Sequence, residues 1–359
     1  MKKLILLAAI FISCKTFAFD TWWHAECTRK AMVANGFSGD ARLATQVSNY
    51  IADFMAGTFD KANEELEKRG LEQLRLTGGD ASYSYIHFDG VLSEAEMEQN
   101  WNLLFINTVN TLKKYSAPGA VKPGFRLIVL FNIIGTSIHA VQDFYSHSNW
   151  VNLHNAAGKS PVPIWFDLSE ADRKKLKLES GVYPDGSMPG HPNHSDLNKD
   201  VSSRPLNSMA VEAAERASTD WVKRIMDSTS FVPWAELKAY SIQNDMVMKR
   251  FLVSLDATFL TSSSIIASHL DGDSPAKYIF DKDKNAKKEK AQAAAALLMV
   301  LDNYAANMGI RQNEFLLPSP YWSGFKVYFI TRDISQGLTL KGKKYAMPKE
   351  KPKEKTKPQ

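Results

Sequence analysis

Apolar positions recur with the spacing of an α-helix through most of the chain between residues 24 and 310. The pattern predicts helices over residues 41–54, 61–74, 94–114, 125–145, 206–226, 234–251 and 287–307. Strand-like patterns occur only within residues 321–340, where residues 326–330 could pair with residues 338–340 in a β-hairpin. We therefore expect a mainly α fold, in which a multi-helix domain is followed by a small C-terminal extension containing the hairpin.

Residues 149–205 interrupt the helical pattern. They contain six of the 15 Pro and three of the eight His of the chain. A long stretch without regular structure inside a compact domain is usually functional or disordered. Its histidines, His154, His191 and His194, are therefore candidates for a functional site.

The first 18 residues have the pattern of a secretory signal peptide. Lys2 and Lys3 precede an apolar run over residues 4–12, and residues 16–18 have the small-x-small pattern of a cleavage site. We expect cleavage after residue 18 and a mature protein that is periplasmic or secreted. Cleavage before Cys14, as in a lipoprotein, is the alternative.

The rest of the chain divides by composition into three parts. Residues 19–270 form the main helical domain, and residues 271–345 form the C-terminal extension. Residues 346–359 are rich in Lys and Pro, which predicts a disordered basic tail. Such a tail is solvated or touches anionic lipid.

Charge and cysteine content narrow the class of protein. The chain is 44% hydrophobic and 23% charged, which is typical of a globular protein. Its net charge of +5 comes from the two ends, since residues 19–340 carry a net charge of −4. An acidic body argues against a broad nucleic-acid-binding surface. Cys27 is the single cysteine after residue 18, so no internal disulfide can form, and a bound metal could stabilise the fold instead.

The densest group of candidate ligands is His139, Asp143 and His147. Residues four apart on an α-helix turn by about 40° per step, so the three side chains can share one face. Imidazole and carboxylate together suit Zn²⁺, and the central carboxylate could bridge two ions. The preceding run is strongly apolar, which predicts a buried helix. Burying these groups is costly unless they are paired or bind a metal. We interpret them as metal ligands.

Three further residues are ambiguous when taken singly. Asp53 ends a predicted helix, where a carboxylate is usually solvated. His87 lies in an aromatic-rich segment, where a histidine is usually part of the core, and His24 lies close to the expected mature N-terminus.

The order of these residues is similar to that in the zinc-dependent phospholipases C and the zinc nucleases that cut single strands. Residues 147–150 and 194–200 resemble the HET-C branch of this superfamily, and the export signal resembles that of the secreted bacterial enzymes. The resemblance covers roughly residues 19–255 in layout. It implies an all-helical catalytic domain with three zinc ions per chain, held by Phe19, His24, Asp53, His87, His139, Asp143, His147, His194 and Asp200.

The resemblance also implies how these ligands are divided. Asp143 would bridge the first and second zinc ions, and the second would be completed by His24 and the amine of Phe19, with Asp20 as the alternative to that amine. The third would lie between His147 and His194, with an acid.

The sequence departs from the family at this third position. The family places the acid four residues after the second histidine, where this chain has Asn198. Asp200 and Asp196 are therefore the alternatives for the acid. His147 also follows Asp143 by four residues, where the family has six.

By resemblance the protein is a phospholipase C that acts as a monomer on phosphatidylcholine-type lipid at a membrane surface. It would have no stable nucleic-acid partner. Asp53 would position or deprotonate the attacking water, while Phe54, Tyr83 and Tyr85 are candidates to contact the choline headgroup. A single-strand nuclease or 3′-nucleotidase is the alternative enzyme, because it uses the same metal chemistry. A non-catalytic zinc-binding interaction protein is the third hypothesis.

Overall fold

The computed structural model describes residues 21–52, 86–121, 126–183 and 185–241, together with residues 67 and 333–334. These residues form a mainly α fold, as expected, and contain two isolated β-bridges but no strand. The longer helices are α1 (Thr21–Ala34), α2 (Gly39–Ala52), α5 (Glu94–Ser116), α6 (Arg126–His147) and α10 (Asn207–Ser228). The shorter ones are α7 (Trp150–Ala156), η2 (Trp165–Asp167), α8 (Glu170–Arg173), α9 (His194–Leu197) and α11 (Trp234–Lys238).

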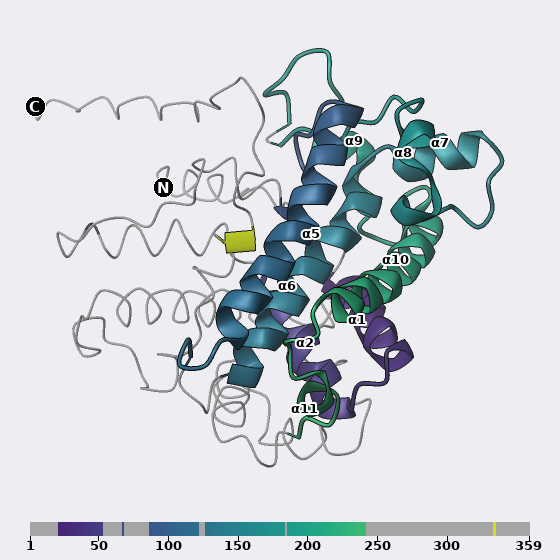
Figure 1. Cartoon of the computed structure of the whole chain (residues 1–359). Coiled ribbons are helices and arrows are strands. Elements are labelled where there is room, and N and C mark those ends of the chain that lie inside the picture. Colours follow the sequence, from purple (N-terminus) through teal and green to yellow (C-terminus); the bar gives the residue numbers. More distant parts are fainter. Residues whose placement is uncertain are drawn as a thin grey trace, which may run out of the picture.

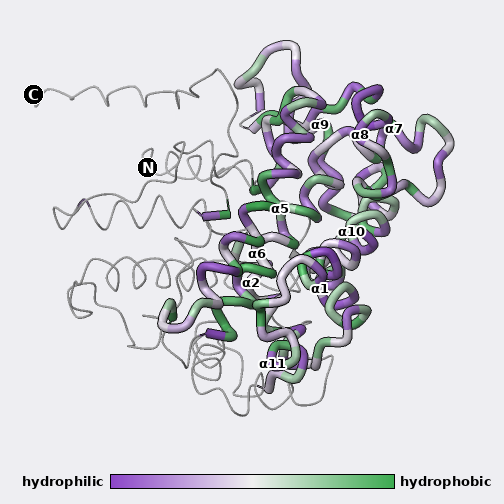
Figure 2. Tube along the Cα trace, in the orientation of Figure 1, coloured by the Kyte–Doolittle hydropathy of each residue, from purple (hydrophilic) through white to green (hydrophobic). Residues whose placement is uncertain are grey.

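Helix α6 is the centre of the fold. Every residue from Ile128 to His147 is buried, and α6 packs against α1, α2, α5 and α10 (Figure 1). A helix that is apolar on all sides must be covered by other elements. Figure 2 shows green, hydrophobic stretches around the α5 and α6 labels, alternating with purple, hydrophilic ones. Helix α6 is also long and apolar enough to cross a membrane, but 94% of its apolar window is buried inside the protein, as in the core helix of a globular domain.

The ends of α5 follow from local sequence. The Ser93 side chain accepts a hydrogen bond from Glu96 N, and the Glu96 side chain accepts one from Leu92 N. This reciprocal pair fixes the start of the helix. The helix ends just before Ala117-Pro118-Gly119, and Pro118 lacks the N–H that a continuing helix needs.

Helices α2 and α6 cross at very short range at Gly135. A Cβ atom at this position would lie 2.6 Å from Ser48 Cβ, 2.7 Å from Thr45 O and 2.8 Å from Asn49 N. Two of these neighbours are backbone atoms, which cannot move without shifting α2. Glycine is therefore required for the crossing, which also places Asn49 beside α6.

We expect Gly135→Ala to lower the free energy of unfolding by about 1–3 kcal/mol, because the added methyl overpacks this crossing. Denaturant unfolding measures the change. Gly39→Ala is the matched control, since its Cβ would meet only Arg42 Nη2, at an ordinary 3.4 Å. Equal stability of the two variants would contradict the prediction.

Several predicted elements differ from the observed ones. Of the predicted helix over residues 234–251, the structure describes residues 234–241, and α11 ends within them at Lys238, because Lys238 O and Tyr240 O accept hydrogen bonds from Ser38. Helix α1 was not among the predicted helices, and residues 149–205 contain four short helical segments that were not predicted. The predicted helices over residues 61–74 and 287–307 and the hairpin lie almost entirely outside the described residues, as do the signal peptide, most of the C-terminal extension and the basic tail.

Candidate metal centre

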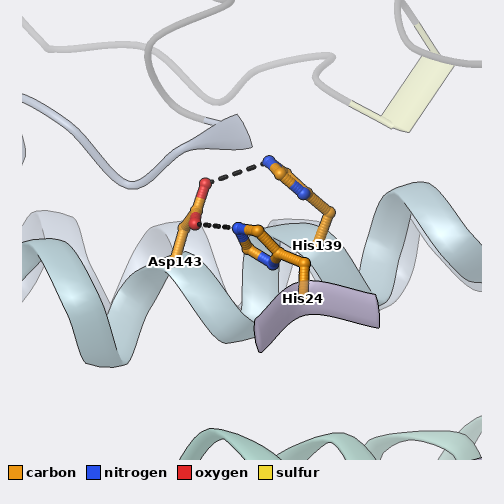
Figure 3. Close-up of side chains that lie close together, drawn as sticks. All are labelled: His24, His139 and Asp143. Atoms are coloured by element: carbon orange, nitrogen blue, oxygen red, sulfur yellow. Dashed lines mark ion pairs between the residues drawn. The ribbon is translucent and has the colours of Figure 1, made fainter. Parts of the chain in front are cut away.

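The first candidate metal site is a cluster of His24, His139 and Asp143, which we call group 1. Figure 3 shows His139 and Asp143 on α6 and His24 on α1, with the two carboxylate oxygens facing different imidazoles. Asp143 Oδ1 lies 3.1 Å from His24 Nε2, and Asp143 Oδ2 lies 3.1 Å from His139 Nε2. All three side chains are fully buried. Residues four apart on α6 thus share one face, as their spacing predicts.

His87 joins group 1 from the segment before α5. Its Nδ1 lies 2.7 Å from Asp143 Oδ2 and 3.0 Å from His139 Nε2. Four of the predicted ligands therefore converge around one carboxylate.

The second candidate site is a cluster of Asp89, His147 and His194, which we call group 2. Asp89 Oδ1 lies 2.8 Å from His194 Nδ1 and 3.4 Å from His147 Nδ1. Asp200 Oδ1 lies 3.3 Å from His147 Nε2, on the other side of that ring. Each of these four side chains is at least nine-tenths buried.

A three-residue segment connects the two groups. His87 contacts group 1, and Asp89 belongs to group 2. Phe88 between them has a φ of +51°, which is uncommon for a residue other than glycine. The Phe88 ring is buried against Trp101 and Phe144, with ring centroids 5.5 and 5.4 Å away. Core packing thus holds the backbone in a conformation that directs the flanking side chains to different groups.

His147 is tied to the same segment. Its Nδ1 lies 2.7 Å from His87 O. A carbonyl oxygen only accepts, so Nδ1 carries the hydrogen and Nε2 faces Asp200. Asp200 is therefore a candidate ligand in addition to Asp89 of group 2.

Gly181 is packed between the elements that carry group 2. Gly181 N donates to His147 O at 2.9 Å, and Gly181 O accepts from Gly90 N at 2.8 Å. A Cβ atom on Gly181 would lie 2.5 Å from His194 Cα. The absence of a side chain at this position allows His147 and His194 to approach.

Lys199 is a buried residue that links the elements around group 2. Its ammonium donates to Ser146 O, Ser148 O and Leu197 O at 3.1, 3.0 and 2.7 Å. These bonds join the C-terminal end of α6 to α9. Burial lowers the pKa of Lys199 to about 7, although Asp200 acts in the opposite direction.

The charges within the two groups shift each other's pKa values. Burial opposes the charged form of Asp143, but His139, His147 and His24 hold the pKa of its carboxyl well below the usual range. Burial also acts to lower the pKa of His147, but Asp89, Asp143 and Asp200 raise it well above its usual value of 6.5. The metal-free protein therefore keeps Asp143 ionised and His147 protonated near neutral pH.

This shift gives a pH prediction for the metal-free protein. The folded state retains the His147 proton above pH 6.5, where the unfolded state releases it. The stabilisation is complete below pH 6.5 and is lost as the pH rises through the raised pKa. With a chelator present, the unsubstituted protein should have a larger free energy of unfolding than His147→Gln. We expect this difference to become smaller as the pH rises.

The His147→Gln variant is the reference because Lys199 acts in the opposite direction. The lowered pKa of Lys199 makes stability rise with pH above about 7 in both proteins, so the subtraction removes it. A difference that stayed constant between pH 6 and 9 would contradict the assigned shift.

Two buried carboxylate oxygens indicate that a cation fits these groups. Asp143 Oδ1 and Asp200 Oδ2 accept no hydrogen bond within the described part of the chain. Leaving a buried charged acceptor unsatisfied costs more than about 1–3 kcal/mol. A metal ion would satisfy these oxygens, and imidazole with carboxylate is a donor set that suits Zn²⁺ and similar divalent ions.

Three predicted candidates, Asp196, His154 and His191, do not belong to either group. Asp196 is exposed, and its side chain caps the start of α9 by accepting from Asn193 N at 2.8 Å, so of the two alternative acids Asp200 is the one near His147. His154 packs on Trp150, and His191 is half-exposed beside Glu179, so neither joins a group. Five predicted residues lie outside the described residues, namely Phe19, Asp53, Phe54, Tyr83 and Tyr85. The alternative ligand Asp20 also lies outside them.

Sequence reasoning did not identify Asp89 as a ligand. This carboxylate occupies the place beside His194 for which Asp200 and Asp196 were considered. The sequence carries a weak signal, because Asp89 follows His87 by two residues and precedes Gly90, a residue type that favours turns.

Fold and site together define a mainly α-helical protein with two buried groups of His and Asp that could each hold a metal ion. A family model described as the VWA7 N-terminal domain matches residues 130–173. This stretch runs from within α6 to the end of α8 and includes His139, Asp143 and His147. No curated protein and no solved structure matches the chain.

Proposed function

We propose that the protein is a secreted zinc-dependent phosphodiesterase of the phospholipase C type. It would hydrolyse phosphatidylcholine-type phospholipids to diacylglycerol and a phosphorylated headgroup. The observation that carries the proposal is the pair of buried groups joined through residues 87–89. Structural zinc sites usually have four ligands rich in cysteine, whereas His and Asp ligands are typical of catalytic sites.

The proposed ligands are those of both groups. His24, His139, His87 and Asp143 would hold zinc at group 1, where Asp143 directs its oxygens toward different histidines. Two ions there would be completed by Asp53 and the Phe19 amine, and a third would be held at group 2. When bound, zinc ions supply a water of lowered pKa and a clamp for the phosphate oxygens.

The residues of the chain have separate parts in this reaction. Asp53 would orient the attacking water and accept its proton, while Phe54, Tyr83 and Tyr85 would contact the choline headgroup. The proposed reaction requires no cysteine nucleophile. Cys27 is also unsuited to that role, because it is buried, its thiol donates to Val211 O, and burial raises its pKa.

Metal analysis combined with two substrates tests the proposal. The mature protein, beginning at residue 19, should contain zinc and release phosphocholine from phosphatidylcholine vesicles. Release of phosphatidic acid would indicate a different bond specificity and overturn the phospholipase C assignment. Faster release of mononucleotides from single-stranded DNA would favour the nuclease alternative. Full zinc content without turnover of either substrate would favour the interaction protein.

A further inference from the structure

Two carboxamide side chains lie behind group 1, on the side of the histidine rings away from Asp143. The atom Gln142 Oε1 is 2.6 Å from His24 Nδ1, and Asn49 Oδ1 is 3.1 Å from His139 Nδ1. The two amides also contact each other, because Asn49 Nδ2 donates to Gln142 Oε1 at 3.0 Å. Both amide side chains are fully buried. Two histidines on different helices are therefore joined by one network.

The direction of each hydrogen bond depends on how the amides are oriented, and Ser218 fixes that orientation. The Ser218 hydroxyl donates to Ala214 O at 2.7 Å, so its oxygen must accept from Gln142 Nε2, which is 3.2 Å away. A hydroxyl has only one hydrogen to give. The amide nitrogen of Gln142 therefore faces Ser218, and its oxygen faces His24 and Asn49.

The orientation of Asn49 follows from that of Gln142. Because Gln142 Oε1 can only accept, the neighbouring Asn49 atom must be its nitrogen. That nitrogen also donates to Thr28 Oγ1 at 2.9 Å. The oxygen of Asn49 is then left facing His139 Nδ1. The donor and the acceptor of each hydrogen bond are therefore assigned along the whole network, from α10 through α6 to α2.

We infer that Gln142 and Asn49 are positioning residues that hold His24 and His139 in the tautomer protonated at Nδ1. The lone pair of each neutral ring is then on Nε2, the atom that lies 3.1 Å from Asp143. The position of His87 agrees with this assignment. Its Nδ1 lies 3.0 Å from His139 Nε2, a contact in which one nitrogen must offer a hydrogen and the other a lone pair.

The network also lacks charge. Amide oxygens fix the hydrogen on each Nδ1 without adding a second carboxylate behind the rings, and they leave each Nε2 facing the side on which Asp143 lies. Partners that orient a ligand histidine typically change metal affinity by 10–100-fold when they are removed. This consequence rests on the proposed metal-binding function, but the tautomers themselves are a property of the metal-free protein.

Nitrogen-15 NMR of histidine side chains in the metal-free mature protein tests the inference directly. We expect both His24 and His139 to carry their hydrogen on Nδ1. In Gln142→Met, His24 should move to the Nε2–H tautomer, donating to Asp143, and zinc affinity should fall by roughly 10–100-fold. Gln142→Glu retains an acceptor for His24 Nδ1, so this nitrogen should keep its hydrogen.

The control is Gln46→Met, which removes another buried amide. Gln46 donates to Ala25 O at 2.9 Å, a backbone oxygen rather than a histidine ring, so its loss should leave both tautomers unchanged. Nε2–H tautomers in the unsubstituted protein would overturn the inference, even if Gln142→Met failed to fold. Nδ1–H tautomers in a protein that binds no zinc would support the inference and contradict the proposed function.

Discussion

Asp143→Asn should reduce zinc affinity at group 1 by more than about 100-fold and abolish phosphodiester hydrolysis. The carboxylate lies within 3.1 Å of nitrogen atoms on His24, His87 and His139, so among the described residues it is the acid that contacts all three histidines. An amide keeps the shape but supplies only one weakly coordinating oxygen and no charge. Zinc content per chain and phosphocholine release measure the two effects.

Asp227→Asn is the matched control, because this exposed residue of α10 undergoes the same chemical change away from both groups. It should retain full zinc content and activity. If Asp143→Asn also retained them, the central position of Asp143 in the site would be wrong.

Gly181→Ala should remove the ion from group 2 while leaving group 1 intact. The new methyl would lie 2.5 Å from His194 Cα and 2.9 Å from both Asn193 O and His194 N. These are backbone atoms, so α9 must move, and His194 moves with it. Displacing a ligand by about an ångström is enough to lose most of the function of a site.

The loss should be visible as one fewer zinc ion per chain, and as a weaker binding step in a competition titration with a chromophoric chelator. Gly39→Ala again serves as the control. Unchanged stoichiometry with reduced stability would mean that the crossing is important for folding only.

The helical body could be predicted because its signals are local. The apolar run of α6 and the apolar spacing of α5 lie within the helices themselves, so neither signal depends on contacts with distant residues. The end of α11 could not be predicted, since it depends on hydrogen bonds from Ser38, about 200 residues earlier in the chain. Helix α1 has a weak pattern because it lies between α2 and α10, with polar residues such as Thr28 buried in its interface.

The residues of the candidate site also divide into those that local sequence predicts and those whose positions depend on tertiary folding. His139, Asp143 and His147 could be predicted together, because helical geometry alone places them on one face. His24, His87 and His194 were suggested by resemblance in order, and their proximity to α6 is a result of tertiary folding. Asp89 was missed because its role depends on the backbone conformation at Phe88, and its place between His87 and Gly90 indicates only that a turn could occur there.

The two roles of Phe88 determine which substitutions in this protein should reduce its metal-dependent activity. Its ring belongs to the aromatic core with Trp101 and Phe144, whereas its backbone sets the directions of His87 and Asp89. A change in the core that lets this ring shift would rotate two candidate ligands at once. In a mutational scan scored by metal-dependent activity, Phe88 and Trp101 should therefore rank beside the ligands, although neither has an atom that can bind an ion.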